Sequence, residues 1–400
     1  MARLKILALN AGSSSLKVSL FDLDAAGEDG LDPRGLLWAA ERTSETQPLT
    51  ELLAPLLSGG GEGVAAQSSV NAVGHRVVHG GAALRESTRL TPSVITEIER
   101  VVEYAPAHNA GALGLIAAAT ELFGTDIPQI AVFDTAFHRT LPPAAFTYAG
   151  PYAWLAQGIR RFGFHGINHE YASHRARVLL GRAADDLRVV TCHLGSGCSL
   201  AAVRNGVSVE TTMGFTPLDG LPMARRSGVI DPGILLHLLR HGGQTIESLD
   251  QVLNHESGLA GLSGTSGDMR AVLAAVDAGD LRARLALDVF VHHVRQGIAA
   301  MAASMGGVNA IVFTGGIGEH VSRVRSEICE SLTFLGIALD PALNAGASGE
   351  ADISLADART RVLVIPAQEN WMIARECIRL LQLPSDHART TRAVTDNWPT

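Results

Sequence analysis

Two turns built from small residues are the features of this sequence best suited to chemistry, because both could bind a phosphate. The first turn, residues 11–15, reads Ala-Gly-Ser-Ser-Ser and separates an apolar run (4–10) from an alternating run (16–22). Its glycine and serines expose backbone N–H groups and hydroxyls that can surround an anion, and Lys17 lies close by in the sequence. An ordinary Ser/Gly hairpin loop would have the same composition, so this turn alone leaves both interpretations open.

The second turn repeats this pattern in the other half of the chain. Residues 194–198 read Leu-Gly-Ser-Gly-Cys and lie between the predicted strands 187–193 and 199–203. Asn205 and Gly206 then predict a two-residue hairpin that leads into a third strand. The recurrence favours the phosphate interpretation and indicates a duplicated α/β chain whose two domains clamp a nucleotide.

Further elements follow each hairpin in the same order. In the first half, Thr91 and the proline after it predict a helix start, and a second helix is expected from about residue 111 to 123. The strand 127–133 then delivers Asp134 at its carboxyl end, where ligand chemistry gathers in α/β sheets. In the second half we expect helices at about 233–240, 281–305 and 322–332, strands at 310–314 and 363–365, and a closing helix.

Two arginines and two acids are the charged residues that we single out. Arg76 and Arg226 suit phosphate or carboxylate, because a guanidinium donates two parallel hydrogen bonds and keeps its charge. Asp134 and Glu369 follow predicted strands, and Mg²⁺ needs only one or two carboxylates beside waters and substrate phosphates. The alternatives are surface loops for the arginines and helix caps for the acids.

Other cofactor classes fit the sequence poorly. The chain has no G-x-x-x-x-G-K-[ST] segment, which argues against a P-loop kinase. Residues 315–318 read Gly-Gly-Ile-Gly but do not complete G-x-G-x-x-G, so they fit an adenosine lying against backbone better than a nicotinamide dinucleotide. His169 and His174 miss the H-E-x-x-H spacing by one residue, so we expect a histidine facing an anion rather than a zinc site.

Composition and charge predict a globular chain without the general basic field that nucleic acid or an anionic membrane would need, so we expect neither as a partner. The 400 residues are 46% hydrophobic and 18% charged, with a formal net charge of −8. The four cysteines form no C-x-x-C pair, and no segment resembles a signal peptide or a membrane span. We therefore expect a cytoplasmic protein. The expected organisation is an N-terminal domain (1–137), a C-terminal domain with the nucleotide site and dimer contacts (138–369), and a closing helix with a polar tail (370–400).

Six segments together resemble the acetokinase family, and the resemblance runs nearly end to end. They are residues 10–17 (Asn-Ala-Gly-Ser-Ser-Ser-Leu-Lys), 74–81 (Gly-His-Arg-Val-Val-His-Gly-Gly), 132–138, 162–166, 213–228 and 314–319. The resemblance implies a duplicated actin-like (ribonuclease H-like) ATPase fold with two domains flanking a nucleotide cleft. It also implies a homodimer that transfers the γ-phosphoryl group of ATP reversibly to acetate, giving acetyl phosphate and ADP by in-line displacement with Mg²⁺ or Mn²⁺.

The resemblance also implies roles for individual residues. Asn10, Arg76, His165 and Arg226 match the surroundings of the transferred phosphoryl group, Asp134 matches the catalytic acid, and Asn10 and Glu369 match the metal site. The nucleotide site is matched by Ser15, Lys17, His193, Gly195, Ser196, Gly197, Asp268, Arg270, Gly315, Gly316, Ile317 and Gly318, and a further site histidine by His108. The acyl pocket is matched by Val78, Ala107, Phe164 and Pro217.

Four positions depart from the family pattern. Ser196 stands where the family usually has asparagine, and Gly267 and Met269 replace the usual asparagine and phenylalanine, which bears on nucleotide preference. Ala107 stands where leucine is common beside the acyl pocket. Each missing CH₂ loses about 0.8 kcal/mol of contact, so propionate or a slightly larger acid should be accepted more readily. A propionate or butyrate kinase is therefore one alternative, and an actin-like or sugar-kinase-type ATPase without acyl transfer is another.

Overall fold

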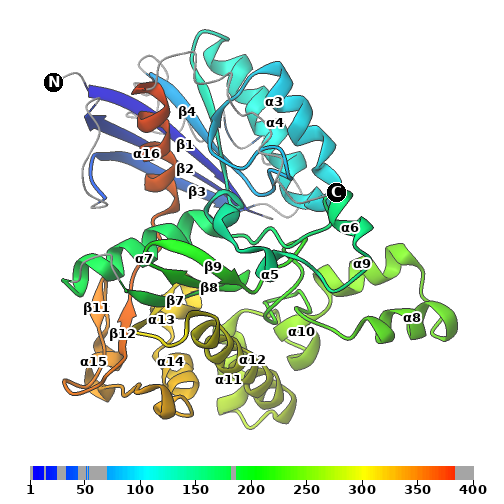
Figure 1. The fold of residues 1–400 in the computed structure, drawn as a ribbon, viewed down its shortest axis with the longest axis vertical. Coiled ribbons are helices and arrows are strands. Elements are labelled where there is room, and N and C mark those ends of the chain that lie inside the picture. The colour runs from blue at the N-terminus through cyan, green and yellow to red at the C-terminus, as the bar shows by residue number, and fades with distance from the viewer. Residues whose placement is uncertain are drawn as a thin grey trace. The chain divides into compact units, whose positions relative to one another are not determined.

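The computed structural model of the chain describes residues 3–12, 15–24, 33–43, 51, 53, 70–181 and 186–382 (Figure 1). The chain divides into two compact units. Unit 1 consists of Met1–Phe137, Gly166–Tyr171 and Gln368–Thr400, and unit 2 of His138–His165 and Ala172–Ala367.

A six-stranded sheet forms the centre of unit 1, in the order β3-β2-β1-β4-β6-β5. The first three strands form an antiparallel meander, β1, β4 and β6 run parallel, and β5 is an antiparallel edge strand. The predicted opening hairpin is therefore confirmed. The strands are β1 (Arg3–Ala11), β2 (Ser15–Asp24), β3 (Leu36–Thr43), β4 (Ala72–Val77), β5 (Thr88–Arg89) and β6 (Gln129–Phe133).

The sheet of unit 2 repeats this topology strand for strand, in the order β11-β12-β10-β7-β8-β9. Strands β7, β8 and β9 form the meander, β7, β10 and β12 run parallel, and β11 is the antiparallel edge. The predicted duplication is confirmed by this equivalence. The strands are β7 (Arg188–Leu194), β8 (Cys198–Arg204), β9 (Val207–Thr211), β10 (Ala310–Thr314), β11 (Ala351–Asp352) and β12 (Arg361–Val364).

Helices surround both sheets. Within the described ranges, the helices of unit 1 are α3 (Pro92–Arg100), η1 (Val102–Tyr104), α4 (Pro106–Phe123) and α16 (Glu369–Gln382). Helix α7 (Gly166–Leu179) begins in unit 1 and ends in unit 2, and η2 (Ala136–Thr140) also contains residues of both. Those of unit 2 are α5 (Pro143–Phe146), α6 (Ala153–Ala156), α8 (Pro232–His241), α9 (Ile246–His255), α10 (Gly258–Ser263), α11 (Met269–Asp277), α12 (Leu281–Met305), α13 (Gly315–His320), α14 (Ser322–Cys329), η3 (Thr333–Leu335) and α15 (Pro341–Gly346).

Several local signals in the sequence act as predicted. The Thr91 side chain caps α3 by accepting a hydrogen bond from the N–H of Val94. Asn205 and Gly206 both have positive φ (54° and 81°), as a tight hairpin turn requires. The helix expected from residue 111 begins earlier, at Pro106, because a proline at the first helical position needs no N–H partner.

One helix packs closely on each sheet at a glycine. A Cβ added at Gly74 in β4 would lie 2.5 Å from Ile373 and 2.6 Å from Cys377 of α16. In unit 2, a Cβ added at Gly297 of α12 would lie 2.5 Å from Leu200 of β8. The close approach of helix and sheet therefore depends on the missing side chain in both units. Among the helices in the described ranges, none has the length and apolar character that a membrane span requires.

Candidate active site

The parallel strands of unit 1 bring three predicted residues to one edge of the sheet. Asn10 is near the end of β1, Arg76 is near the end of β4, and Asp134 directly follows β6. Arg76 binds the Asp134 carboxylate with two hydrogen bonds, Nε to Oδ1 at 2.9 Å and Nη2 to Oδ2 at 2.6 Å. The two side chains are only 10% and 1% exposed. This pair is a bidentate, largely desolvated ion pair.

Asn10 joins this ion pair to a second carboxylate. Its Oδ1 accepts a hydrogen bond from Arg76 Nη1 at 3.2 Å, and its Nδ2 donates to Glu369 Oε2 at 2.9 Å. Glu369 is the first residue of α16, so the closing helix supplies this acid. The four side chains form one polar cluster of one cation, two acids and an amide, which we call the Arg76 cluster.

The carboxylates of the cluster hold the charge on Arg76. Burial by itself would lower the pKa of the guanidinium, but the nearby Asp134 and Glu369 carboxylates outweigh that effect and raise the pKa above its ordinary value. Arg76 therefore stays cationic at any working pH and can attract an anionic substrate.

Other predicted residues of unit 1 lie around the hairpin and β4. Lys17 pairs with Asn10 in the register of β1 and β2, and its exposed Nζ lies 3.8 Å from Glu41 Oε1. Ser15 begins β2, and its carbonyl accepts the N–H of Gly12 at 2.7 Å. Val78 is buried directly after β4. His108 lies in α4, as does Ala107, whose side chain is outside the part of the structure that is described.

A second cluster, in unit 2, surrounds the turn between β7 and β8. The His165 ring stacks on the His193 ring, with centroids 4.1 Å apart and an interplanar angle of 17°. Nδ1 of His165 shares a 2.8 Å hydrogen bond with the hydroxyl of Ser199, which orients the ring. A Cβ added at Gly197 would lie 3.2 Å from His165 Nε2 and 3.9 Å from Arg226 Nη1, so both groups lie beside the turn. We call these residues the His165 cluster.

Backbone geometry contributes to this cluster. His165 precedes α7 with φ of 54°, in the left-handed region that residues other than glycine rarely adopt, and such conformations are concentrated at functional sites. Nη1 of Arg226 donates to the carbonyl of Pro217 at 3.1 Å, which fixes the guanidinium against the loop after β9. Phe164, immediately before His165, is fully buried.

The glycines after β10 lie beside the same turn. They form the start of α13, and a Cβ added at Gly195 would lie 3.9 Å from the backbone nitrogen of Gly316. Gly315 has φ of 77° and a Cβ there would lie 2.9 Å from the Leu194 carbonyl oxygen, so only glycine fits. Ile317 and Gly318 are buried. Ser196 is exposed in the turn.

The predicted adenosine residues Asp268 and Arg270 form a surface pair. Asp268 caps α11 through the N–H of Arg270 at 2.8 Å, and Arg270 Nη2 lies 2.6 Å from Asp268 Oδ2. The Arg270 side chain is 86% exposed. One of the two departures nearby has a structural reason: Gly267 has φ of 83°, and the Ala224 carbonyl is too close for a Cβ. Met269 is the first residue of α11 and is buried.

Ser199 of the His165 cluster and Glu319 of α13 were not predicted from the sequence as side chains with a role. Ser199 pairs with His193 in the register of β7 and β8, and strand pairing is the signal that could have identified it. Glu319 accepts the N–H groups of Gly315 (2.7 Å) and Ala367 (3.0 Å) on Oε1, and so joins the ends of β10 and β12. No sequence spacing predicts that contact between residues 48 positions apart.

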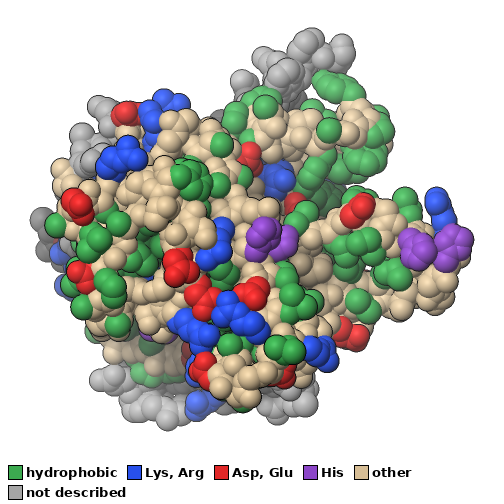
Figure 2. Space-filling view, turned by 90° about the horizontal axis from the view of Figure 1, so that it is seen from below, with side chains coloured by type: hydrophobic (Ala, Val, Ile, Leu, Met, Phe, Trp, Pro, Cys, Tyr) green, Lys and Arg blue, Asp and Glu red, His purple; other side chains and the backbone are tan. Residues whose placement is uncertain are grey.

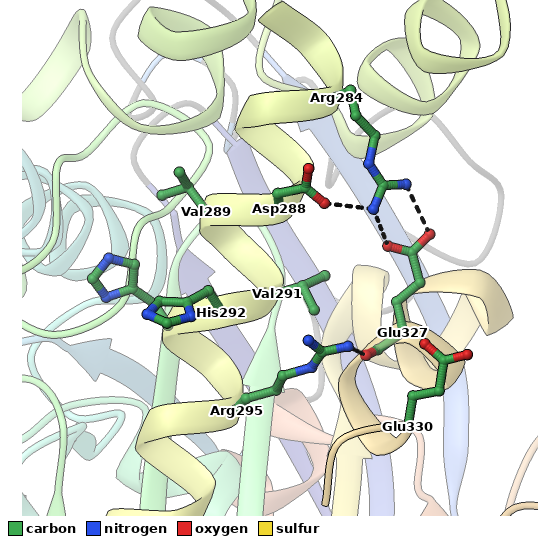
Figure 3. Close-up of a pocket in the computed structure, with 9 residues that line it drawn as sticks. Arg284, Asp288, Val289, Val291, His292, Arg295, Glu327 and Glu330 are labelled. Atoms are coloured by element: carbon green, nitrogen blue, oxygen red, sulfur yellow. Dashed lines mark hydrogen bonds and ion pairs between the residues drawn. The ribbon is translucent and has the colours of Figure 1, made fainter. Parts of the chain in front are cut away.

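A pocket of about 670 Å³ lies elsewhere in unit 2, between α12 and α14 (Figure 3). Arg284 pairs there with Asp288 and Glu327, and Arg295 donates to the Glu327 carbonyl. Figure 2, which views this side of the molecule, shows Lys/Arg and Asp/Glu side chains interspersed on the surface. None of the predicted site residues lines this pocket. We therefore do not place the active site there.

No group of three or more His, Cys, Asp or Glu residues within the described ranges is arranged to hold a metal ion. A magnesium ion does not require such a group of three side chains, because it binds through one or two carboxylates together with waters and substrate phosphates. Glu369 fits that requirement, because its carboxylate is a hard oxygen donor and carries the negative charge that a divalent cation needs. Asn10 turns its amide nitrogen toward Glu369 and its oxygen toward Arg76, so in this arrangement it orients the carboxylate.

Comparison with known proteins gives one consistent result. The acetokinase family model matches residues 38–375. Acetate kinase of Gloeobacter violaceus is 50% identical over 94% of this chain and 98% of its own length, and acetate kinase of a Synechococcus strain is 49% identical over 95% and 100%.

Solved structures agree with this. Acetate kinase of Porphyromonas gingivalis is similar with a TM-score of 0.83 and 34% identity, covering 95% of this chain and all of that one. A propionate kinase from Francisella tularensis has the same TM-score and identity over 93% and 98% of the two chains.

Proposed function

This chain belongs to the acetokinase family, and from that membership and the two clusters we propose that it transfers the γ-phosphoryl group of ATP to acetate, giving acetyl phosphate and ADP. The observation that carries the proposal is the Arg76 cluster, because its permanently charged, largely buried guanidinium keeps unused N–H donors that suit an anionic acceptor.

Arg76 has donors to spare for that acceptor. Among the described residues its hydrogen bonds go to Asp134 and Asn10 and use three of its five N–H groups. The remaining N–H groups lie one on each terminal nitrogen, which suits the two oxygens of a carboxylate. Acetate is ionised at pH 7, because carboxylic acids have pKa values of about 4–5, so no general base is needed.

The His165 cluster suits the transferred group. The charge that develops on the phosphoryl oxygens can be stabilised by the Arg226 guanidinium and the Nε2 side of His165, both beside the Gly197 turn. We propose that the backbone N–H groups of the turn through Gly195 and Gly197 and of Gly315–Gly318 hold the nucleotide. Asp134 would serve by holding Arg76 in place, since both its oxygens bind that side chain.

Magnesium, or manganese in its place, would be held by Glu369 with Asn10 beside it. When bound, the ion neutralises the β- and γ-phosphates of ATP. The amide of Asn10 orients the Glu369 carboxylate through their 2.9 Å hydrogen bond. Replacing Glu369 with glutamine should therefore weaken metal-dependent nucleotide binding, which calorimetry with Mg-ADP can measure directly.

A propionate or butyrate kinase is the closest alternative, and the similarity to a propionate kinase structure favours keeping it. A panel of acetate, propionate and butyrate with ATP and Mg²⁺, read by hydroxamate trapping, decides between these acids. If ATP turnover were independent of any acid, an ATPase of the actin or sugar-kinase type would be the correct assignment. An Ala107→Leu variant tests the acyl pocket, because it should shift selectivity toward acetate.

We further propose a cytoplasmic homodimer. Helix α8 has no buried residue, and its Ile234, Leu236 and Leu239 side chains are 45%, 49% and 40% exposed. Apolar side chains presented together on one helix favour a partner surface, and a second copy of the chain is the partner that we propose. Light scattering should give a dimer for the wild type and a monomer for Leu236→Glu.

A further inference from the structure

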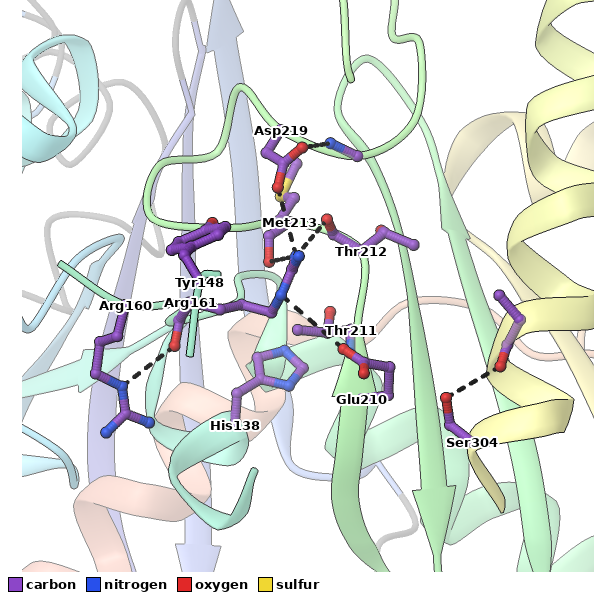
Figure 4. A network of polar contacts seen from close by, with 12 residues as sticks. His138, Tyr148, Arg160, Arg161, Glu210, Thr211, Thr212, Met213, Asp219 and Ser304 are labelled. Carbon is purple, nitrogen blue, oxygen red and sulfur yellow. Dashed lines mark hydrogen bonds and ion pairs between the residues drawn. The ribbon is translucent and has the colours of Figure 1, made fainter. Parts of the chain in front are cut away.

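A network around Arg161 holds the loop that carries Pro217 (Figure 4). Arg161 lies between α6 and α7, and its Nη1 donates to the carbonyls of Thr212 at 2.8 Å and Met213 at 3.0 Å. The side chain is only 20% exposed. These carbonyls belong to the first residues of the segment 212–220, which we call the Pro217 loop.

The same guanidinium also contacts the far end of the Pro217 loop. Arg161 Nη1 lies 3.5 Å from Asp219 Oδ2, while Asp219 Oδ1 accepts the N–H of Gly220 at 2.8 Å. Glu210, before the loop, lies 3.9 Å from Arg161 Nε. Arg161 therefore connects the two ends of the loop to each other.

The first part of the Pro217 loop is held by neighbours of Arg161. The N–H groups of Phe162 and Gly163 donate to the Gly214 carbonyl at 3.0 and 3.3 Å, and the Tyr148 hydroxyl accepts the N–H of Phe215 at 2.8 Å. A Cβ added at Gly214 would lie 2.1 Å from the Tyr148 hydroxyl oxygen. The loop is thus packed without room for movement at this point.

The centre of the loop carries Pro217, whose carbonyl accepts a hydrogen bond from Arg226 Nη1 at 3.1 Å. Contacts therefore run from Arg161 through the loop backbone to the guanidinium assigned to the phosphoryl group. Pro217 itself is assigned to the acyl pocket. The positions of Pro217 and of the Arg226 guanidinium therefore depend on where the two ends of the loop are held.

We propose that Arg161 is a positioning residue that sets the size of the acyl pocket through the Pro217 loop, and so determines which carboxylic acid the enzyme accepts. This inference rests on the proposed function. Arginine suits the role because its planar group is rigid: Nη1 faces the Thr212 and Met213 carbonyls and the Asp219 carboxylate, while Nε lies on the side of Glu210. Because the first part of the loop is held by other contacts as well, we expect loss of the guanidinium to release the Asp219 end, which opens space beside Pro217.

The test is the acid selectivity of an Arg161→Gln variant. The ratio of kcat/KM for acetate to that for propionate does not depend on how much of the enzyme is folded. We expect this ratio to fall by about tenfold, which is the lower end of the discrimination that a confined pocket achieves for one methylene. The affinity for ADP, measured by calorimetry, should change by less than about twofold, since the loop residues are assigned to the acid.

Arg361→Gln is the matched control, because Arg361 also binds two carbonyls (Leu355 and Ala356) and one carboxylate (Asp352) in the same unit. In Arg361→Gln, the ratio of kcat/KM for acetate to that for propionate should equal that of the wild type. Tyr148→Phe provides a second route to the same loop, since it removes the acceptor of the Phe215 N–H, and it should lower the ratio in the same direction.

An unchanged ratio of kcat/KM for acetate to that for propionate in soluble Arg161→Gln would overturn the inference while the proposed function stood. If Arg161→Gln does not fold, an unchanged ratio in both Arg161→Lys and Tyr148→Phe would overturn it. A wild-type enzyme that formed no acyl phosphate from any acid would overturn the proposed function itself. The two failures are therefore distinguishable in one set of measurements.

Discussion

His165 and His193 stack face to face, with ring centroids 4.1 Å apart and an angle of 17° between the ring planes. Ser199 bonds Nδ1 of His165, so the ring is held both by its edge and by its face. This arrangement leaves the Nε2 side of His165 directed at the turn through Gly197. A histidine that stabilises a transferred phosphoryl group needs such fixed placement, because its contribution depends on a preorganised position.

The stack predicts different effects for two substitutions of His193. In His193→Phe an aromatic face remains under His165, so we expect kcat to stay within about tenfold of the wild type. In His193→Ala the ring loses that support, and kcat should fall by about a hundredfold. Steady-state kinetics of acyl phosphate formation give kcat for both variants. An equal loss of kcat in the two variants would show that the stacking contact with His165 does not contribute to catalysis.

Arg226→Ala should lower kcat by about a thousandfold or more, because an arginine that stabilises the transferred phosphoryl group is worth that much in related chemistry. The fold should survive, since Arg226 makes its main-chain hydrogen bond to a loop rather than to the core of the sheet. Circular dichroism confirms folding, and hydroxamate trapping measures the rate. Near-wild-type acyl phosphate formation by this variant would refute the role assigned to Arg226.

Asp134→Ala should destabilise unit 1 by about 3–5 kcal/mol, because it leaves the largely buried Arg76 charge without its bidentate partner. The double variant Arg76→Met/Asp134→Leu removes both charges and should recover most of that loss, while remaining inactive. Urea unfolding measures the stability of both. A cost below about 1 kcal/mol for Asp134→Ala would mean that water reaches Arg76.

Acid should destabilise the protein in part through His138, whose pKa is lowered to about 4. Burial is the main cause, opposed by the hydrogen bond to the Phe164 carbonyl, while Ser208 bonds the other ring nitrogen. Since the folded pKa lies below the unfolded value of about 6.5, the neutral form is the stable one: stability is complete above pH 6.5 and is lost as the pH falls through 4. The loss should reach about 3 kcal/mol.

The measurement for His138 is the unfolding free energy between pH 4 and 8 in wild type and His138→Gln. The variant should be less stable at pH 8 but should show a flatter decline between pH 6.5 and 4. Parallel curves for the two proteins would show that His138 does not contribute to acid sensitivity. Carboxylates titrate in both proteins, so their effect cancels in the difference.

Local structure was largely predictable from the sequence, because it depends on neighbours in the chain. Both hairpins, the Thr91 cap and helix α12 follow from turn residues, capping and apolar periodicity. Asp134 was expected at the end of a strand, and it lies there. The start of α4 was placed too late, because a proline reads equally as a helix stop and as a first helical residue.

The sequence by itself thus determined the duplicated order of elements and the types of residues at the ends of strands. Only the tertiary structure decided which of them meet. The Arg76–Asp134 pair exists because β4 and β6 are parallel neighbours, and the Arg161 contacts to Thr212 and Met213 join residues 51 and 52 positions apart. Such contacts depend on strand order and loop packing, which local residue preferences do not encode.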